Sequence, residues 1–244
     1  MRIVLALALL SLFVSPGMAG EAQIAVAANF AEPAREIARA FAAKGAHTAR
    51  LSFGASGAFF AQIGQGAPFD VFLSADEERP RKLAEEGHGV ASSRFAYAMG
   101  RLALWSRDAG RAKGEETLRE ARFDKIAVAN PAGAPYGAAA HDAMKALGVA
   151  DALKPKIVEG ASIGQTFQFV ETGNAEWGFV ALSQTVGKGG SLWLVPAHLH
   201  APIRQDAILL KHGADNAAAT AFLDFLKSAE ARAIAARYGY ETAP

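Results

Sequence analysis

The sequence predicts an α/β protein built from two similar lobes, each with a mainly parallel sheet flanked by helices. Short apolar runs typical of strands alternate with runs whose apolar residues recur at helical spacing. This alternation occurs in two sets, and each set is long enough to form a core of its own. Small or polar turns follow several of the strands, at the place where parallel sheets bind ligands.

The first set has the order strand, helix, strand, helix, strand, helix. Its predicted helices each end at a glycine, and Ser74-Ala-Asp-Glu77 has the pattern of a capping box that opens the third helix. This order predicts a parallel sheet with helices on both faces. The predicted strands are 23–28, 48–53 and 70–73, and the predicted helices are 33–44, 57–65 and 74–86.

The second set begins near residue 100. Its predicted strands are 101–105, 125–129, 156–159 and 177–181, and its predicted helices are 137–147 and 164–171. A late strand at 207–210 and a helical C-terminus over 217–238 follow. We expect the first lobe to comprise 21–98 plus 204–244 and the second to comprise 99–203, with a hinge formed by the two connecting strands.

Composition excludes several classes of function. Of the 244 residues, 51% are hydrophobic and 20% are charged, which is typical of a globular chain. The formal net charge is +1 and there are no basic blocks, so the sequence argues against nucleic acid or an anionic membrane as a partner. The count of zero cysteines excludes disulfides, thiolate metal sites and cysteine nucleophiles.

The first nineteen residues have the three parts of a signal peptide. Arg2 precedes an apolar run over 3–14, and Gly17 and Ala19 supply the small residues of a cleavage site. Twelve apolar residues are too few to span a bilayer, which needs about 20. We therefore expect cleavage after Ala19, with Ala22 as a second candidate, and export to the periplasm.

Four turns lie at comparable places in the chain, each between a strand and a helix. They cover 27–30, 53–57, 130–137 and 160–164. The first N–H groups of a helix lack intrahelical partners and carry part of a positive charge, so several helix starts aimed at one point bind an anion. The turns add neutral donors, Asn29, Ser56 and Tyr136, and hold no cation. Taken singly, each turn is also explained as an ordinary helix cap.

Longer motifs identify a family. The runs are LSFGASG at 51–57, AQIGQGAPFDVFLSAD at 61–76 and RYGY at 237–240. With them the chain resembles the periplasmic molybdate-binding proteins of ABC transporters, which are type II periplasmic binding proteins. The resemblance covers nearly all of residues 21–244.

The resemblance implies a ligand cleft between the lobes. By position, the ligand residues correspond to Asn29, Ser56, Tyr136 and the main-chain N–H of Ile163. The expected ligand is molybdate or tungstate. It also implies a permease of the inner membrane as partner, no cofactor, and a monomer.

Two positions depart from the commonest form of the family. Many members have Ser in place of Asn29 and Tyr in place of Ala181, so Tyr136 is expected to supply the missing hydroxyl. Asp70 and Asp76 belong to the strongest motif, yet a carboxylate near a dianion costs about 1 kcal/mol per charge even in water. We expect both to be structural.

Three other readings remain open at this stage. The ligand could be another tetrahedral oxyanion. Gly54-Ala-Ser56-Gly-Ala58 resembles a nucleophile elbow without its last glycine, and a serine hydrolase would then need partners such as Asp206 and His212. His198 and His200 have the spacing of a metal pair on a strand, but no third ligand lies nearby in the sequence.

Overall fold

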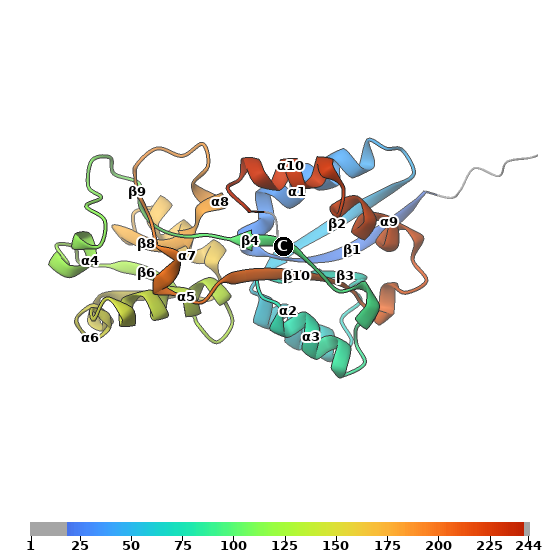
Figure 1. Ribbon diagram of the computed structural model, residues 1–244, viewed down its shortest axis with the longest axis horizontal. Helices are drawn as coiled ribbons and strands as arrows, with labels where there is room; N and C mark the ends of the chain where they lie inside the picture. Colours follow the sequence, from blue (N-terminus) through green and yellow to red (C-terminus); the bar gives the residue numbers. More distant parts are fainter. Residues whose placement is uncertain (1–18, 242–244) are drawn as a thin grey trace, which may run out of the picture.

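Two five-stranded sheets form the centres of the two lobes (Figure 1). This computed structural model describes residues 19–241; apart from Ala19, the predicted signal segment lies outside them. The first sheet has the strand order β2-β1-β3-β10-β4. Its strands are β1 (Gly20–Ala27), β2 (His47–Gly54), β3 (Val71–Leu73), β4 (Phe95–Gly100) and β10 (Ile203–Leu209).

Helices cover both faces of this first sheet, because β1 is apolar on both sides. Ile24 and Val26 pack under α1, α9 and α10, whereas Ala25 packs with Phe59 and Leu83 under α2 and α3. Figure 1 shows these two helical layers on opposite sides of the sheet. The helices are α1 (Ala31–Ala42), α2 (Ser56–Gly64), α3 (Glu78–Glu85), α9 (Ala217–Leu226) and α10 (Ala229–Arg237).

The second sheet has the strand order β7-β6-β8-β5-β9. It too has a hydrophobic core on each of its two faces. Leu102 and Leu104 belong to one core, and Ala103 and Trp105 to the other, as strand alternation requires. The strands are β5 (Leu102–Ser106), β6 (Ile126–Ala129), β7 (Ile157–Gly160), β8 (Trp177–Ala181) and β9 (Ser191–Leu194). The helices are α4 (Glu116–Glu120), α5 (Pro135–Ala146), α6 (Ala150–Leu153), α7 (Ile163–Glu171) and α8 (Leu182–Thr185).

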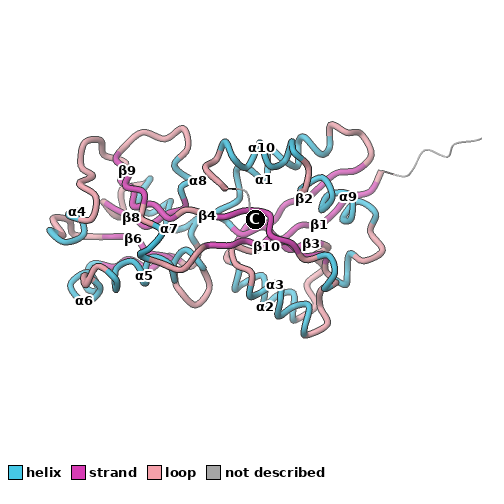
Figure 2. The backbone as a smooth tube through the Cα atoms, in the orientation of Figure 1, coloured by secondary structure: helices cyan, strands magenta, loops and turns pink. Residues whose placement is uncertain are grey.

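The chain crosses between the lobes twice, and both crossings lie beside one another. It leaves β4 for β5 through Arg101 and returns from β9 to β10 through residues 195–202. β4 and β10 pair antiparallel, and Figure 2 shows them running together along the middle of the molecule. The C-terminal segment joins this pair, because Met99 and Glu241 exchange two main-chain hydrogen bonds.

The predicted two-lobe α/β fold is confirmed, and each sheet is mixed. β1, β2 and β3 are parallel, while β10 runs antiparallel to both of its neighbours; in the second sheet β5 is the reversed strand. The reversed strands are the two that begin after a crossing. Short connectors complete the chain: η1 (Ala28–Phe30), η2 (Ala91–Ser93), η3 (Lys154–Lys156), η4 (Ala197–Leu199) and η5 (Lys211–Gly213).

Two local predictions were wrong. Helix α3 begins at Glu78 instead of Ser74, because the Asp76 carboxylate, and not the Ser74 hydroxyl, accepts the main-chain N–H of Arg79 at 2.9 Å. The C-terminal helix is two helices, separated where Ser228 caps α10 through the N–H of Ala231. The strands β4 and β9 were not predicted. Within residues 19–241, no helix has both the length and the apolar character needed to cross a bilayer.

Candidate functional site

A small pocket lies where the four predicted turns meet. The first two turns come from the first lobe and the other two from the second, so the pocket lies between the lobes. All four predicted ligand residues line it, together with Ala75, which follows β3. None of the described residues that line it is charged.

Ser56 enters the pocket from the first turn of α2. Its hydroxyl is not used to cap that helix, and instead its oxygen accepts the main-chain N–H of Ala75 at 3.0 Å. A hydroxyl that accepts one hydrogen bond still has its own proton to donate. Ser56 is 1% exposed, so an acceptor for that proton must lie inside the pocket or the protein.

Asn29 is fixed by the protein more tightly than expected. Its side-chain nitrogen donates to Gln205 Oε1 at 2.8 Å and to the Tyr240 hydroxyl at 2.9 Å, while Oδ1 has no partner among the described residues. Both side-chain N–H groups are therefore occupied. The donor that Asn29 keeps for a ligand is its main-chain N–H, in the first turn of η1.

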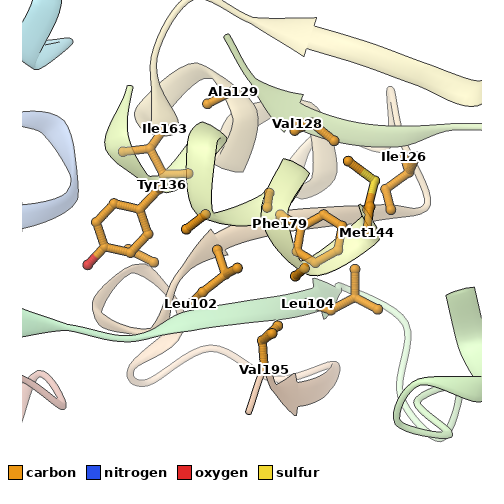
Figure 3. Close-up of a cluster of buried hydrophobic side chains, with 14 of the residues drawn as sticks. Leu102, Leu104, Ile126, Val128, Ala129, Tyr136, Met144, Ile163, Phe179 and Val195 are labelled. Carbon is orange, nitrogen blue, oxygen red and sulfur yellow. The ribbon is translucent and has the colours of Figure 1, made fainter. Parts of the chain in front are cut away.

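Tyr136 lies in the first turn of α5, where Pro135 fits the first helical position. Its ring packs in the core of the second lobe, and its hydroxyl points away from the aliphatic side chains (Figure 3). The hydroxyl accepts from Gln205 Nε2 at 3.2 Å. Burial raises the pKa of Tyr136 well above its usual range, and the neighbouring Tyr240 raises it further, so the hydroxyl keeps its proton.

Ile163 is the first residue of α7, and its side chain is buried. The preceding Ser162 is an ordinary cap, because its hydroxyl oxygen accepts the N–H of Gln165 at 3.2 Å. The N–H of Ile163 lies at the helix start, where main-chain donors have no intrahelical partner. This turn therefore offers a main-chain donor and not a side-chain donor.

The two lobes meet around the pocket in direct contacts. Gly57 N donates to Gly133 O at 2.9 Å, and Ser183 Oγ donates to Asn29 O at 2.7 Å. A Cβ on Gly57 would lie 2.8 Å from the Cα of Gly133, so the approach requires glycine there. Arg79 crosses the same gap to Ala132 O at 2.8 Å. The two lobes are therefore closed around the pocket.

Asp70 and Asp76 do not line this pocket. Asp70 accepts from Gln23 N at 2.7 Å and from Asn216 Nδ2 at 3.0 Å, and it pairs with His212. Asp76 accepts the main-chain N–H of Arg79 in the first turn of α3 and pairs with the Arg79 side chain. Both carboxylates brace neighbouring turns, as expected from the cost of placing them beside an anion.

The hydrolase arrangement is not assembled. His212 binds Asp70, and Asp206 binds Arg94 at 2.5 Å, so neither is placed to activate Ser56. His200 bonds to the carbonyl oxygen of Ala201, and His198 lies in η4 and not on a strand. Among residues 19–241 no group of three or more His, Cys, Asp or Glu side chains is placed to hold a metal ion.

Sequence reasoning missed the residues behind the pocket. Gln205, Tyr240 and Ser183 contact Asn29 from three distant parts of the chain. The motif that ends at Tyr240 was a usable signal, since its conspicuous tyrosine had no role. Nothing local marks Gln205 or Ser183.

Two α/β lobes that close on a small pocket lined by neutral donors define a binding protein for a small solute. The sequence pattern of the family described as bacterial extracellular solute-binding protein matches residues 22–241. The chain belongs to this family and is a binding protein, not an enzyme.

Two relatives and one solved structure that resemble this chain are named as molybdate-binding proteins. The chain is 53% identical to the molybdate-binding protein ModA of Rhodobacter capsulatus, covering 97% of this chain and 94% of that protein. It is 50% identical to a molybdate-binding protein ModA of Azotobacter vinelandii, covering 98% and 96%. The solved structure of an Azotobacter vinelandii periplasmic molybdate-binding protein superposes with a TM-score of 0.89 at 37% identity, covering 91% of this chain and all of that one.

Proposed function

We propose that the protein captures molybdate in the pocket between its lobes and delivers it to an ABC transporter for import. One observation carries the proposal: turns from both lobes bring Asn29, Ser56, Tyr136 and Ile163 to one uncharged pocket. The names of the relatives at 53% and 50% identity support the ligand and the transport role.

The chemistry of the pocket suits a fully ionised oxyanion. Hydroxyl protons of Ser56 and Tyr136 and the main-chain N–H groups of Asn29 and Ile163 are neutral donors, and helix starts add partial positive charge. These groups offer protons, which a fully ionised oxyanion can accept at each of its oxygens, whereas hydrogen phosphate carries a proton of its own that also needs a partner. Tungstate has the same charge and tetrahedral shape as molybdate, so we propose that it binds as well.

The wider setting follows from the same proposal. The segment 1–19 directs export, the mature protein acts as a monomer in the periplasm, and its closed form docks on an inner-membrane permease. It uses no cofactor and binds no nucleic acid. The lobes divide near the predicted boundaries, 21–98 plus 204–244 and 99–203, with the crossings at Arg101 and 195–202 as the hinge.

Titration calorimetry with molybdate, tungstate, sulfate and phosphate tests the ligand. We expect molybdate and tungstate to bind and hydrogen phosphate to fail. At a free ligand concentration of 100 times Kd, binding stabilises the fold by about 2.7 kcal/mol, which raises the melting temperature by roughly 5–10 °C. Unchanged melting with both oxyanions, together with a rise on adding a divalent metal ion, would overturn the assignment.

A further inference from the structure

We propose that Gln205 is a positioning residue for ligand binding, which holds the Tyr136 hydroxyl as a donor to the bound anion. This inference rests on the proposed function. Gln205 lies on β10, is 0% exposed and does not line the pocket, so it acts on the ligand through its neighbours.

The side chain of Gln205 connects ligand residues of the two lobes. Its Oε1 accepts from Asn29 Nδ2 at 2.8 Å, and its Nε2 donates to the Tyr136 hydroxyl at 3.2 Å. Asn29 is 176 residues away in the chain and Tyr136 is 69 residues away. A single buried amide therefore contacts the side chain of one pocket residue from each lobe.

The direction of these bonds determines what Tyr136 can do. An amide has one oxygen, and on Gln205 that oxygen accepts from Asn29 Nδ2 at 2.8 Å. The Tyr97 hydroxyl lies 3.0 Å from the same oxygen, but its single proton can also go to Ser74 O at 3.0 Å. The Asn29 amide thus orients the oxygen, and the NH₂ group faces Tyr136. Because the Tyr136 oxygen receives this hydrogen bond, Gln205 does not compete for the Tyr136 proton, which faces either the Tyr240 hydroxyl or an acceptor in the pocket.

The backbone leaves room for this pair of side chains. Gly100 ends β4 at the first crossing, and a Cβ placed there would lie 2.1 Å from the Tyr136 oxygen and 2.5 Å from Gln205 Nε2. Any other residue at this position would displace the contact. The fold therefore contains a space shaped for the bond between Gln205 and Tyr136.

The surroundings keep the network neutral. Tyr97, Tyr136 and Tyr240 are the titratable side chains that face Gln205, and burial raises the pKa of each, that of Tyr240 to about 12. Asp76 and Asp206 also raise the pKa of Tyr97, and each is paired with arginine, Asp76 with Arg79 and Asp206 with Arg94 and Arg204. A carboxyl group in place of the Gln205 amide would have a raised pKa in this setting, because burial favours its neutral form.

The substitution Gln205→Glu gives a direct test with a distinctive pH profile. At mildly alkaline pH the new carboxylate accepts from Tyr136 and takes its proton away from the anion. We expect molybdate affinity to fall by roughly 10–150-fold, which corresponds to the loss of one hydrogen bond to a charged ligand. On acidification the protonated carboxyl again offers one donor and one acceptor, so affinity should recover.

A double-mutant cycle tests whether Gln205 acts through Tyr136. We expect Gln205→Leu to weaken binding much less in a Tyr136→Phe background than in the wild-type background. The control is Gln62→Glu on the exposed side of α2, which adds the same charge and should shift affinity less than threefold at every pH. Calorimetry gives the affinities, and melting of the ligand-free variants shows that each one folds.

The outcomes separate the two ideas. If the wild-type protein binds neither molybdate nor tungstate, the proposed function is wrong. If the wild type binds, but Gln205→Glu binds equally well at alkaline pH, Gln205 does not position the site. Fully additive losses in the double-mutant cycle, or a loss in Gln205→Glu that acidification does not reverse, would likewise overturn the inference. If Gln205→Leu does not fold, the recovery of molybdate affinity in Gln205→Glu at acidic pH still tests the inference.

Discussion

Helices α2 and α7 both begin at the pocket, one in each lobe, and the serine at each helix start has a different role. Ser162 precedes its helix and caps it through the N–H of Gln165. Ser56 is already the first residue of its helix, caps nothing there, and accepts from Ala75 across the pocket wall. A serine at a helix start is thus available to a ligand when its own helix does not use its hydroxyl.

Replacing Ser56 should produce the largest effect. Ser56→Ala removes a hydrogen bond to a charged ligand, about 1.5–3 kcal/mol, which corresponds to a loss of roughly 10–150-fold in molybdate affinity. It also leaves the buried N–H of Ala75 without its acceptor, so the ligand-free protein should melt at a lower temperature. Calorimetry and thermal melting measure the two effects separately.

Ser106 provides a matched control for this change. It is a fully buried serine whose oxygen also accepts a main-chain N–H, that of Asp108, but it lies outside the pocket. Ser106→Ala should lower the melting temperature without weakening molybdate binding. Equal affinity losses in both variants would mean that Ser56 matters only for stability. Ser56 should also not react with a fluorophosphonate, whereas the nucleophilic serine of a hydrolase would react with it.

Tyr136→Phe comes next, and it examines the donor from the second lobe. The change keeps the ring in its core and removes only the hydroxyl, so affinity should fall by roughly 10–150-fold. The ligand-free protein should also melt at a lower temperature, because the buried Nε2 of Gln205 loses its acceptor. Ala181, where many family members have tyrosine, is buried in the same core. The preference between molybdate and sulfate should shift as well, because a fixed donor meets larger and smaller anions differently.

Tyr238→Phe is the control for that variant, since its hydroxyl bonds to Glu36 at 3.1 Å away from the pocket. It should bind like the wild type. An unchanged affinity in Tyr136→Phe would show that main-chain N–H groups complete the site instead.

The sequence could predict pocket residues that belong to local patterns, but not those that reach the pocket from distant parts of the chain. The turns at Ser56, Tyr136 and Ile163 are local patterns, and strand–helix alternation places them at one edge of each sheet. Gln205 and Tyr240 reach Asn29 from 176 and 211 residues away, and no local pattern records such a contact. They could only be found once the lobes were placed together.

The wrong predictions have a similar cause. Ser74 and Asp76 both stand before α3, and the sequence cannot tell which side chain accepts the free N–H until the chain direction is known. Ser228 looked like one polar residue inside a long helix, yet it starts a new one. The strand β4 pairs with β10 and with the C-terminal segment, so its partners lie far along the chain.

Ser183→Ala should have a smaller effect, confined to closure of the lobes. Its hydroxyl donates to Asn29 O across the gap, a neutral hydrogen bond that contributes about 0.5–1.5 kcal/mol. Affinity for molybdate should fall about 2–13-fold. The dissociation rate should rise while the association rate stays the same, because the bond exists only after the lobes meet. Stopped-flow kinetics resolves the two rates.

The control for closure is Ser191→Ala. Ser191 donates to Asp108 O at the same 2.7 Å, but both residues belong to the second lobe. It should leave both rates unchanged. A slower association rate in Ser183→Ala, with dissociation unaffected, would contradict a role in holding the lobes closed.

Ser162→Ala should have the smallest effect on binding and completes the comparison of the two serines. Loss of the cap of α7 costs about 1 kcal/mol of stability, so melting should fall by roughly 2–4 °C. Molybdate affinity should stay within twofold, because the donor from this turn is the main-chain N–H of Ile163. Ser228→Ala is the matched control: it removes an N-cap bond of the same 3.2 Å from α10, away from the pocket. If Ser162→Ala alone weakened binding, its hydroxyl would serve the ligand too, and capping and binding would no longer divide between the two serines.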